Sequence, residues 1–352
     1  MIKMSNNELY KGKDILVIDA GSGTQDILVY QAGQNIENCP KMVMPSRTRL
    51  VAAQIRRSTQ QGHNVFLYGH VMGGGACFSA VRQHLKAGLK VYTTKQAAYT
   101  FNDNLAKLRQ MGIELAEDAP DNADKIWLGD VDLPAFETAL AAFGQPLPTQ
   151  LAVAVQDHGF SAEESNRRLR FRLWEEFMAK GGLLTDLIFT GEIPAVYTRM
   201  QAVREIAPDA IVTDTGTAAL LGITADPAVQ PFLEKGVLAI NIGNSHTLAA
   251  AIRGQRVYGL FEHHTRLLDT SSLASLVERL QNNELTNEEV FAAGGHGATL
   301  HPDMGRGWDY IAVTGPRRTM AKSLGWHEAA PFGDMMLTGC FGLLIGMGCP
   351  LD

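Results

Sequence analysis

A carboxylate, two hydroxyl groups and closely spaced glycines follow one another in the segment Asp19-Ala-Gly-Ser-Gly-Thr-Gln25. Aliphatic residues lie on both sides of it, so residues 14–30 are predicted to form a β-hairpin with a polar tip. Glycines at such a tip let backbone N–H groups approach an anion, and hydroxyl groups add hydrogen bonds. The tip residues expected to bind an anionic ligand are Gly21, Ser22, Gly23, Thr24 and Gln25.

Asp19 stands at the end of the apolar first strand of this hairpin. A carboxylate in such a place needs a partner or a metal ion. Asp19 is therefore a candidate catalytic residue and a candidate ligand of hydrated Mg²⁺. The alternative is a plain β-hairpin whose Gly-Ser-Gly turn binds nothing.

A second segment, Asn241-Ile-Gly-Asn-Ser-His-Thr247, repeats this design within a predicted hairpin over residues 237–252. Two polar-tipped hairpins that face each other across a cleft would hold a triphosphate from both sides. A third segment, Val313-Thr-Gly-Pro-Arg-Arg318, follows a predicted strand and is expected to point into the same cleft. The ligand-binding residues expected in these two segments are Gly243, Asn244, Ser245, His246, Thr247, Gly315, Arg317 and Arg318.

The two hairpins together resemble the phosphate-1 and phosphate-2 elements of the actin, sugar-kinase and heat-shock-protein ATPase superfamily, and the third segment resembles its adenosine-contacting loop. The resemblance implies an α/β, two-lobed actin-like (ribonuclease H-like) ATPase fold with a central cleft, and ATP with Mg²⁺ as ligands. The superfamily usually has aspartate where this chain has Asn241, which predicts weaker magnesium binding at that position. Asp214, in the loop after the predicted strand 210–212, is the candidate catalytic and metal-binding replacement.

The whole chain also resembles a family labelled pyruvate formate-lyase activating enzyme. The stretches that carry this resemblance are Met72-Gly-Gly-Gly75, Asp157-His-Gly159, Ser165-Asn-Arg167, Phe261-Glu-His-His-Thr265, Gly294-Gly-His-Gly297 and Pro331-Phe-Gly-Asp-Met-Met336. True activators of that kind use a radical mechanism on a three-cysteine iron–sulfur cluster. The four cysteines (Cys39, Cys77, Cys340, Cys349) have no such spacing, so a radical activase is not expected.

Six histidines lie beside predicted glycine turns or strand ends: His70, His158, His246, His263, His264 and His296. A metal or acid–base site is one interpretation, and His158, which follows Asp157, is the candidate catalytic residue. The other interpretation is that each histidine makes one hydrogen bond that stabilises its loop. No HExxH or other metal-ligand spacing decides between them.

Two further groups stand out, and the first of them allows two interpretations. The arginines Arg167, Arg168, Arg170 and Arg172 either bind an anionic second substrate or form a solvated helix face paired with nearby glutamates. An apolar, glycine-rich segment holds Met335, Met336, Cys340 and Met347, which are expected to pack in the core.

Length and composition indicate a globular protein with two lobes, because the chain has 352 residues and 45% are apolar. The predicted lobes are residues 1–222, with the first hairpin and an insertion, and residues 223–352. Net charge is −6 without a basic block, so no nucleic-acid partner is expected. The polar N-terminal residues and the lack of a long apolar run predict a cytoplasmic protein without a membrane partner.

Strands alternate with helices in the predicted order. Strands are expected over 65–68, 90–94, 126–128, 151–155, 210–212, 256–261 and 310–313. Helices are expected over 76–87, 102–111, 134–143, 161–180, 197–206 and 273–281, from residue 218, and in the apolar segment 335–347.

The predicted function is that of an ATP-binding protein: a magnesium-dependent ATPase, a kinase, or an ATP-dependent activator of a partner enzyme. The second substrate is a small molecule or a protein. One alternative, suggested by Asn241, is a nucleotide-sensing scaffold without turnover. Another is a histidine-based metal hydrolase or lyase in the same cleft.

Overall fold

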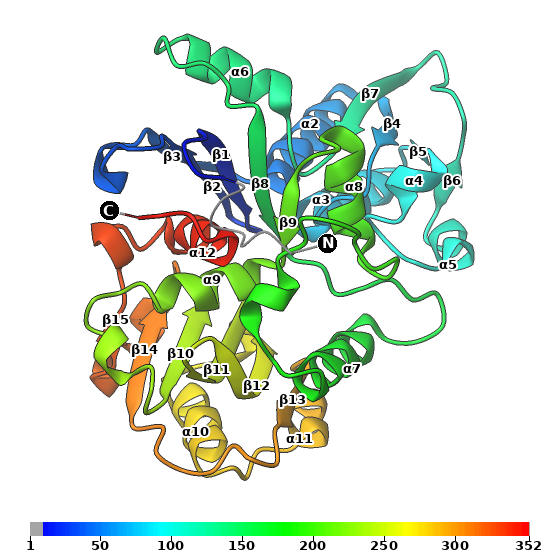
Figure 1. The fold of residues 1–352 in the computed structure, drawn as a ribbon. Helices are drawn as coiled ribbons and strands as arrows, with labels where there is room; N and C mark the ends of the chain where they lie inside the picture. The colour runs from blue at the N-terminus through cyan, green and yellow to red at the C-terminus, as the bar shows by residue number, and fades with distance from the viewer. Residues whose placement is uncertain (1–9, 352) are drawn as a thin grey trace.

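The first central sheet has five strands in the order β3-β2-β1-β8-β9 (Figure 1). The structure, a computed structural model, describes residues 10–351. Strands β1, β2 and β3 form an antiparallel meander, and β8 and β9 run parallel to β1 on its other side. The bounds are β1 (Ile15–Ala20), β2 (Thr24–Tyr30), β3 (Lys41–Pro45), β8 (Gln150–Val155) and β9 (Ile211–Thr213).

The second central sheet, in the order β13-β12-β11-β10-β14-β15, repeats this plan. Strands β10, β11 and β12 form the antiparallel meander, and β14 runs parallel to β10. Two sheets of one topology, each opened by a hairpin, are the duplication that defines the actin-like (ribonuclease H-like) fold, so the predicted α/β fold class is confirmed. The bounds are β10 (Val237–Ile242), β11 (His246–Arg253), β12 (Arg256–His264), β13 (Gly297–Leu300), β14 (Tyr310–Thr314) and β15 (His327–Glu328).

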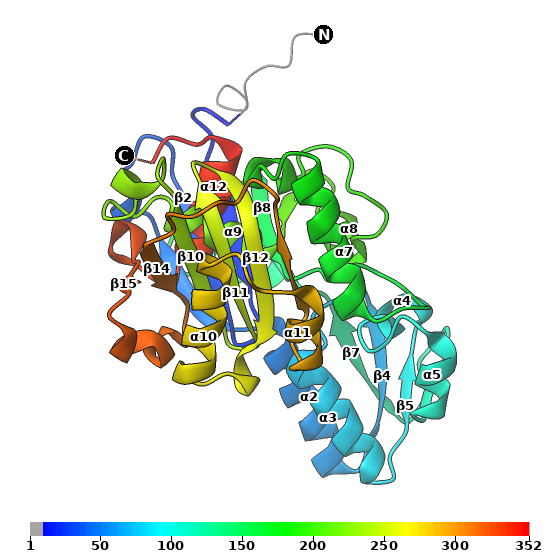
Figure 2. The same ribbon diagram turned by 90° about the horizontal axis from the view of Figure 1, so that it is seen from below.

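A third sheet, parallel throughout, is inserted between β3 and β8 and lies at one end of the molecule (Figure 2). Its strands are β4 (Asn64–Gly69), β5 (Val91–Thr93), β6 (Ile113–Leu115) and β7 (Ala123–Leu128). Its helices are α2 (Arg47–Gln61), α3 (Gly75–Lys86), α4 (Lys95–Ala98) and α5 (Leu105–Gln110). These elements enclose an apolar core of their own, which includes Val51, Ile55, Leu67 and Val81.

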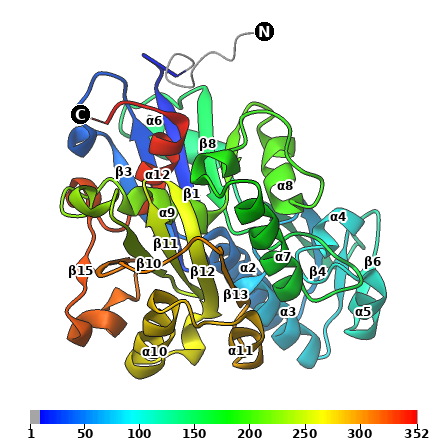
Figure 3. The same cartoon turned by 60° about the horizontal axis from the view of Figure 1, so that its bottom comes forward.

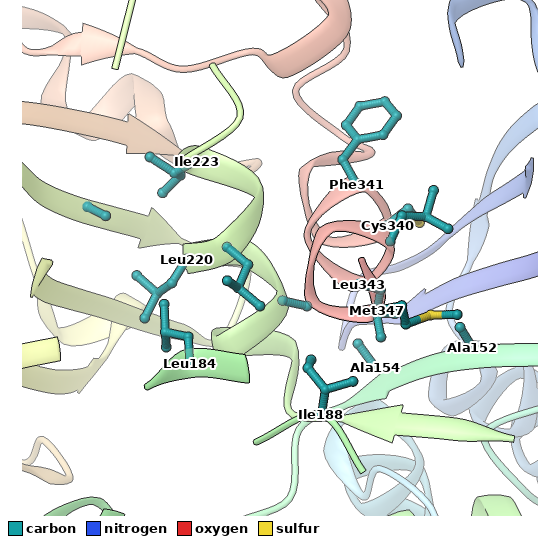
Figure 4. Close-up of a cluster of buried hydrophobic side chains, with 14 of the residues drawn as sticks. Ala152, Ala154, Leu184, Ile188, Leu220, Ile223, Cys340, Phe341, Leu343 and Met347 are labelled. Carbon is teal, nitrogen blue, oxygen red and sulfur yellow. The ribbon is translucent and has the colours of Figure 1, made fainter. Parts of the chain in front are cut away.

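Two helices, α9 (Thr215–Ile223) and α12 (Thr338–Met347), pack against each other between the two central sheets (Figure 4). Helix α9 contacts β10 and β14, and α12 contacts β1, β2 and β8. Glycines make the close crossing possible, because a Cβ atom at Gly342 would lie 1.8 Å from the backbone oxygen of Ala218. A Cβ atom at Gly222 would lie 1.9 Å from the backbone oxygen of Thr338.

The remaining helices cover the outer faces of the central sheets. They are α6 (Leu133–Ala141), α7 (Asn166–Ala179), α8 (Thr198–Ile206), α10 (Thr270–Gln281) and α11 (Asn287–Ala292). Helix α8 packs on β8 and β9, whereas α10 packs on β11 and β12. Helix α7 precedes β9 in the chain but packs on β13 of the second sheet, beside α11 (Figure 3).

Most predicted elements are present, although β3, β6, β13, β15, α4 and α11 were not predicted. Three further differences concern α7, β12 and α2. Helix α7 begins at Asn166, because residues 161–165 form bends held by the Ser161 hydroxyl group. Strand β12 continues to His264, so Glu262 and His263 lie within the sheet and not in a loop after it. Helix α2 was not predicted, since its apolar residues form a narrow stripe among polar ones.

No helix among residues 10–351 is long and apolar enough to cross a membrane. The N-terminal residues 1–9, on which part of the signal-peptide prediction depends, lie outside the described residues. The lobe boundary between residues 222 and 223 stays a prediction.

Candidate functional site

The tips of the β1–β2 and β10–β11 hairpins touch each other. Ser22 Oγ and Ser245 Oγ lie 2.7 Å apart and share a hydrogen bond. A Cβ atom at Gly23 would meet the amide group of Asn244, so the two tips pack closely here as well. The two hairpins that the sequence pairs by their motifs therefore meet in space.

A cavity of about 760 Å³ lies between these hairpins and reaches the loop after β14. Ten of the predicted site residues line it: Asp19, Gly21, Ser22, Thr24, Asn241, Gly243, Asn244, Ser245, His246 and Gly315. The cavity is also lined by Asp26, Gln156 and Glu262, which the sequence did not single out as ligand-binding residues. It is lined as well by Arg170, for which anion binding was one of two interpretations.

Several predicted site residues do not line this cavity. Gln25 is buried and donates a hydrogen bond from Nε2 to the backbone oxygen of Pro45, and Thr247 is bonded to Thr265. After Pro316 the chain turns away from the cavity, so Arg317 is exposed and Arg318 pairs with Glu328 at 3.0 Å. The expectation that both arginines point into the cleft is wrong.

Asp19 and Asp26 are opposite each other in the β1–β2 ladder and both face the cavity. Oδ1 of each is buried and has no hydrogen-bond partner among the described residues. Burial, with the nearby Asp26 and Asp214 charges, raises the pKa of Asp19 well above its usual value. Burial likewise raises the pKa of Asp26 to about 7, against an opposing hydrogen bond from Thr24. The carboxyl groups of Asp19 and Asp26 therefore either bind a cation or stay protonated.

Helix α12 begins directly against Asp19. A Cβ atom at Gly339 would lie 2.0 Å from Oδ2 of Asp19, so glycine is needed for the carboxyl group to fit. The hairpin register could have revealed Asp26 as the second acid, because both aspartates are the same number of residues from the turn centre. No sequence signal placed Gly339 there.

Asp214 is not available as a magnesium ligand. Both of its carboxylate oxygens accept hydrogen bonds from Arg170, at 2.8 and 3.0 Å. Its Oδ1 also accepts from the backbone N–H of Gly216 as the N-cap of α9, and its Oδ2 accepts from that of Asp157. Asp214 thus closes a buried ion pair, and the predicted role of replacing a carboxylate at Asn241 is corrected.

Arg170 is the centre of this ion pair and is 4% exposed. Its Nε donates to Oε2 of Glu262 at 2.9 Å, and its Nη1 donates to the backbone oxygen of Asp157. The two carboxylates raise the pKa of Arg170 against the effect of burial. Arg170 thereby connects α7, the start of α9 and strand β12.

The other three arginines of the predicted group do not face the cavity. Arg168 pairs with Glu288, and Arg172 pairs with Glu164, both near the surface. Arg167 donates from Nη1 to the backbone oxygens of Phe291 and Gly295 at the start of the histidine segment. Arg168 and Arg172 are thus solvated, as one interpretation expected, but only Arg172 pairs with a glutamate near it in sequence, whereas Arg168 pairs with Glu288 of α11. Arg170 and Arg167 make structural contacts between chain segments.

Four histidine rings gather beside the cavity, which sequence spacing did not reveal. The ring centres of His246 and His296 are 4.8 Å apart, those of His158 and His296 are 4.9 Å apart, and His264 lies 4.8 Å from His296. His70 instead bonds to Glu205, as the loop-stabilising interpretation expects. His158, the predicted catalytic histidine, lines a second cavity of about 950 Å³ with His246.

These imidazoles stay neutral near pH 7. Burial lowers the pKa of His296 to about 3 and that of His264 to about 4, and it lowers the pKa of His158 well below its usual value. The Arg170 charge lowers the pKa of Glu262, which keeps that buried carboxylate ionised. The cluster therefore combines neutral nitrogen donors with one negative charge.

Met335 and Met336 correct the prediction that the apolar C-terminal segment is all core. Both are half-buried and line the first cavity opposite the hairpins. Cys340 and Met347, in contrast, are fully buried in α12. The bend before α12, in which Phe332 has φ of +50°, leads the two methionines to the cavity wall.

The comparisons with solved structures find matches at low identity, one of them described as having an actin-like ATPase fold. An exopolyphosphatase-like protein is 12% identical with a TM-score of 0.29; the match covers 86% of this chain and 66% of that one, just under two thirds of its length. A Bacteroides thetaiotaomicron protein with actin-like ATPase fold and unknown function is 6% identical, with coverage of 92% and 90% and a TM-score of 0.34. The ethanolamine utilization protein EutJ from Carboxydothermus hydrogenoformans is 11% identical, with coverage of 93% and 88% and a TM-score of 0.32.

No match was found among curated proteins. A family model does match, over residues 72–320. This stretch contains strands β5, β6 and β7 of the third sheet, the Asp157-His-Gly159 turn, the second hairpin and the whole histidine cluster. The chain therefore belongs to the family described as "Putative pyruvate format-lyase activating enzyme (DUF1786)".

Proposed function

We propose that the chain binds a nucleoside triphosphate with Mg²⁺ in the cavity between the two hairpins. The observation that supports this most is the contact of two glycine tips beside a buried carboxyl group without a partner. The backbone N–H groups of Gly21 and Gly243 donate within their own tips, to the backbone oxygens of Asp19 and His246. The Ser22 and Ser245 hydroxyl groups line the cavity and can donate to phosphate oxygens. The nucleotide would be ATP, by analogy with the fold.

Oxygen donors for magnesium are present on both hairpins. Asp19 and Asp26 supply carboxyl groups with unpartnered buried oxygens, and Asn241 supplies an amide oxygen across the cavity. Hard cations such as Mg²⁺ prefer oxygen ligands and retain several waters, so two or three such groups suffice. Bound Mg²⁺ would neutralise phosphate charge, and the buried acids would then ionise to hold it.

The far end of the cavity suits a nucleoside. Gly315 has φ of +100°, and a Cβ atom there would lie 2.5 Å from the backbone oxygen of Ile242, so the loop stays close to β10. Pro316, Met335 and Met336 line the same end and offer apolar surface to a base. This replaces Arg317 and Arg318 as the proposed nucleoside contacts.

Turnover would make the protein an ATPase, a kinase or an ATP-dependent activator of a partner enzyme. The second cavity borders the first at Ser22, Ser245 and His246, so a second substrate has a place beside the phosphates. Iron–sulfur radical chemistry is not proposed, because the four cysteines are separate, buried free thiols. Free thiols also support a reducing, cytoplasmic setting.

A nucleotide sensor without turnover is the second candidate, and one observation favours it. Asp214 is held by Arg170 and Asn241 is uncharged, so the second hairpin offers no free carboxylate to orient an attacking water. Tight binding with negligible phosphate release would identify this candidate. Release of phosphate by the isolated chain would identify the enzyme.

Calorimetric titration of ATP, with and without Mg²⁺, tests the binding proposal. The variant Asp19→Asn should lose magnesium-dependent binding while it folds normally, because the wild-type carboxyl group is already unpaired. Asp118→Asn, at an exposed position in the third-sheet region, is the matched control and should bind as the wild type does. Equal affinity of Asp19→Asn and wild type for Mg²⁺–ATP would refute the proposed site.

A further inference from the structure

We propose that His158, His246, His296 and Glu262 bind a transition-metal dication of the Zn²⁺ class. This site lies on the wall shared by the two cavities and is separate from the magnesium ligands on the hairpins. It goes beyond nucleotide binding and does not depend on it.

The four donor groups converge from separate parts of the chain. His158 follows β8, His246 opens β11, Glu262 lies in β12 and His296 precedes β13. One ligand atom from each lies within 4.8 Å of the others. A tetrahedral Zn²⁺ site with bonds of about 2.0–2.1 Å places its ligand atoms roughly 3.4 Å apart. Small side-chain rotations, without backbone movement, would close the remaining gap.

Two of the imidazoles have nitrogen atoms that lack any partner. Nε2 of His158 and Nδ1 of His296 are buried and make no hydrogen bond among the described residues. Leaving a buried polar atom unpaired destabilises a fold, so two in one cluster need a reason. A loose ion pair does not supply it, since Nε2 of His158 lies 3.9 Å from Oε1 of Glu262. A metal ion would satisfy both nitrogens.

Gln156 holds His246 and Glu262 in the orientation that metal ligands need. Its Oε1 lies 2.8 Å from Nδ1 of His246, so that nitrogen carries the proton and Nε2 keeps its lone pair free. Its Nε2 donates to Oε1 of Glu262 at 3.1 Å, which fixes the orientation of the amide. Such an outer contact to a ligating histidine is a regular feature of metal sites.

Charge balance at the cluster favours a cation. Arg170 lies between two carboxylates, and its bidentate pair with Asp214 already neutralises it. Glu262, 1% exposed, is the second carboxylate on this one guanidinium, so it leaves negative charge beside three imidazole rings. Neutral imidazole with one carboxylate suits Zn²⁺ and its transition-metal neighbours, whereas Mg²⁺ prefers oxygen ligands throughout.

The backbone around His296 is shaped for this position by the segment 294–297. A Cβ atom at Gly295 would lie 2.5 Å from Cδ2 of His263, and one at Gly297 would lie 2.1 Å from Oδ1 of Asn287. Gly297 also has φ of +150°. Glycines on both sides therefore let His296 reach the other rings, and the Gly-Gly-His-Gly motif gains a physical role.

Zinc titration of untagged full-length protein tests the site. The protein is first stripped with a chelator and then titrated with Zn²⁺ alone, without nucleotide or Mg²⁺. We expect one Zn²⁺ per chain, and with Co²⁺ we expect visible absorption typical of tetrahedral nitrogen–oxygen ligation. Because the readouts use no nucleotide, they separate this proposal from the proposed function.

Variants identify the ligands. His158→Gln and His296→Gln should each weaken Zn²⁺ binding by more than about 100-fold, and Gln156→Leu by about 10–100-fold, as typical of an outer-shell partner. His63→Gln, at an exposed histidine bonded to Asp124, is the control and should bind as wild type. The side chain of His158 is 26% exposed, so His158→Gln should leave folding undisturbed and keeps the test of the site valid. Absence of Zn²⁺ and Co²⁺ binding by wild type, or unchanged affinity in both histidine variants, would overturn the proposal.

Discussion

Replacement of Asp26 by asparagine should stabilise the ligand-free protein, and more so as pH rises. Asp26 is 7% exposed, and its Oδ1 has no hydrogen-bond partner among residues 10–351. Burial raises its pKa from 3.8 to about 7 in the folded chain. Asparagine fills the same space without a group that can ionise, so the variant avoids this penalty.

The sign and size follow from proton linkage. Between pH 4 and 7 the unfolded chain releases the Asp26 proton while the folded chain keeps it, so stability falls as pH rises. The stability that the protonated Asp26 carboxyl group contributes is complete below its pKa in the unfolded chain. It is lost as the pH rises to its pKa in the folded chain. One pKa unit corresponds to about 1.4 kcal/mol, so the shift of about three units sets a ceiling of roughly 4 kcal/mol.

Urea unfolding measures the difference in unfolding free energy between wild type and Asp26→Asn. The measurements are made at about pH 4.5, 5.5, 6.5 and 7.5. The variant should gain relative stability at each step up to about pH 7. Asp118→Asn should run parallel to wild type throughout, because that side chain is exposed. A stability difference between Asp26→Asn and wild type that does not change with pH would refute the unpaired-carboxyl argument.

Three other perturbations test the packing and the ion pair. Gly342→Ala should destabilise the chain by more than about 2 kcal/mol, because its new Cβ meets a backbone oxygen of α9 at 1.8 Å, whereas Gly191→Ala meets no atom within 4 Å and should be neutral in thermal unfolding. Arg170→Met should lower the free energy of unfolding by about 3–5 kcal/mol, because two buried carboxylates lose their partner. Arg172→Ala should lower it by less than about 1 kcal/mol. Chemical denaturation measures both values, and equal losses would contradict the Arg170 ion-pair network. All four thiols should resist a thiol reagent until the protein is unfolded, since they are buried and burial raises the pKa of Cys77 to about 12; rapid labelling of the folded chain would be the opposite result.

The fold was predictable because its signals are local. The sequence of each hairpin consists of an aliphatic run, a glycine turn and a second aliphatic run. The two runs pair as expected in β1–β2 and in β10–β11. Helix α2 was missed because its buried positions, such as Val51 and Ile55, are separated by many polar residues. The order of strands within each sheet is set by long-range pairing, which no single segment encodes.

The site was predictable only where one segment holds it. The two glycine tips were found from their motifs, whereas the Arg170–Asp214 pair joins residues 44 positions apart. Arg170 lies among other arginines on one helix, and the sequence did not show that it is the buried one. The histidine cluster joins His158 to His296 through folding alone, so its spacing resembles no known metal motif.

The Arg170 network explains why the cavity and the histidine cluster occur together. Arg170 lies on α7, its partner Asp214 caps α9, and its partner Glu262 belongs to β12, so one guanidinium group joins three elements that form the cavity wall. Asp214, held by this pair, is not available to the hairpins, which leaves Asp19 and Asp26 as the cavity acids that no arginine holds. Glu262, held by the same arginine, keeps its charge and its second oxygen towards Gln156 and His158. Arg170 thus keeps one carboxylate, Asp214, away from the cavity between the hairpins and orients another, Glu262, towards the histidines.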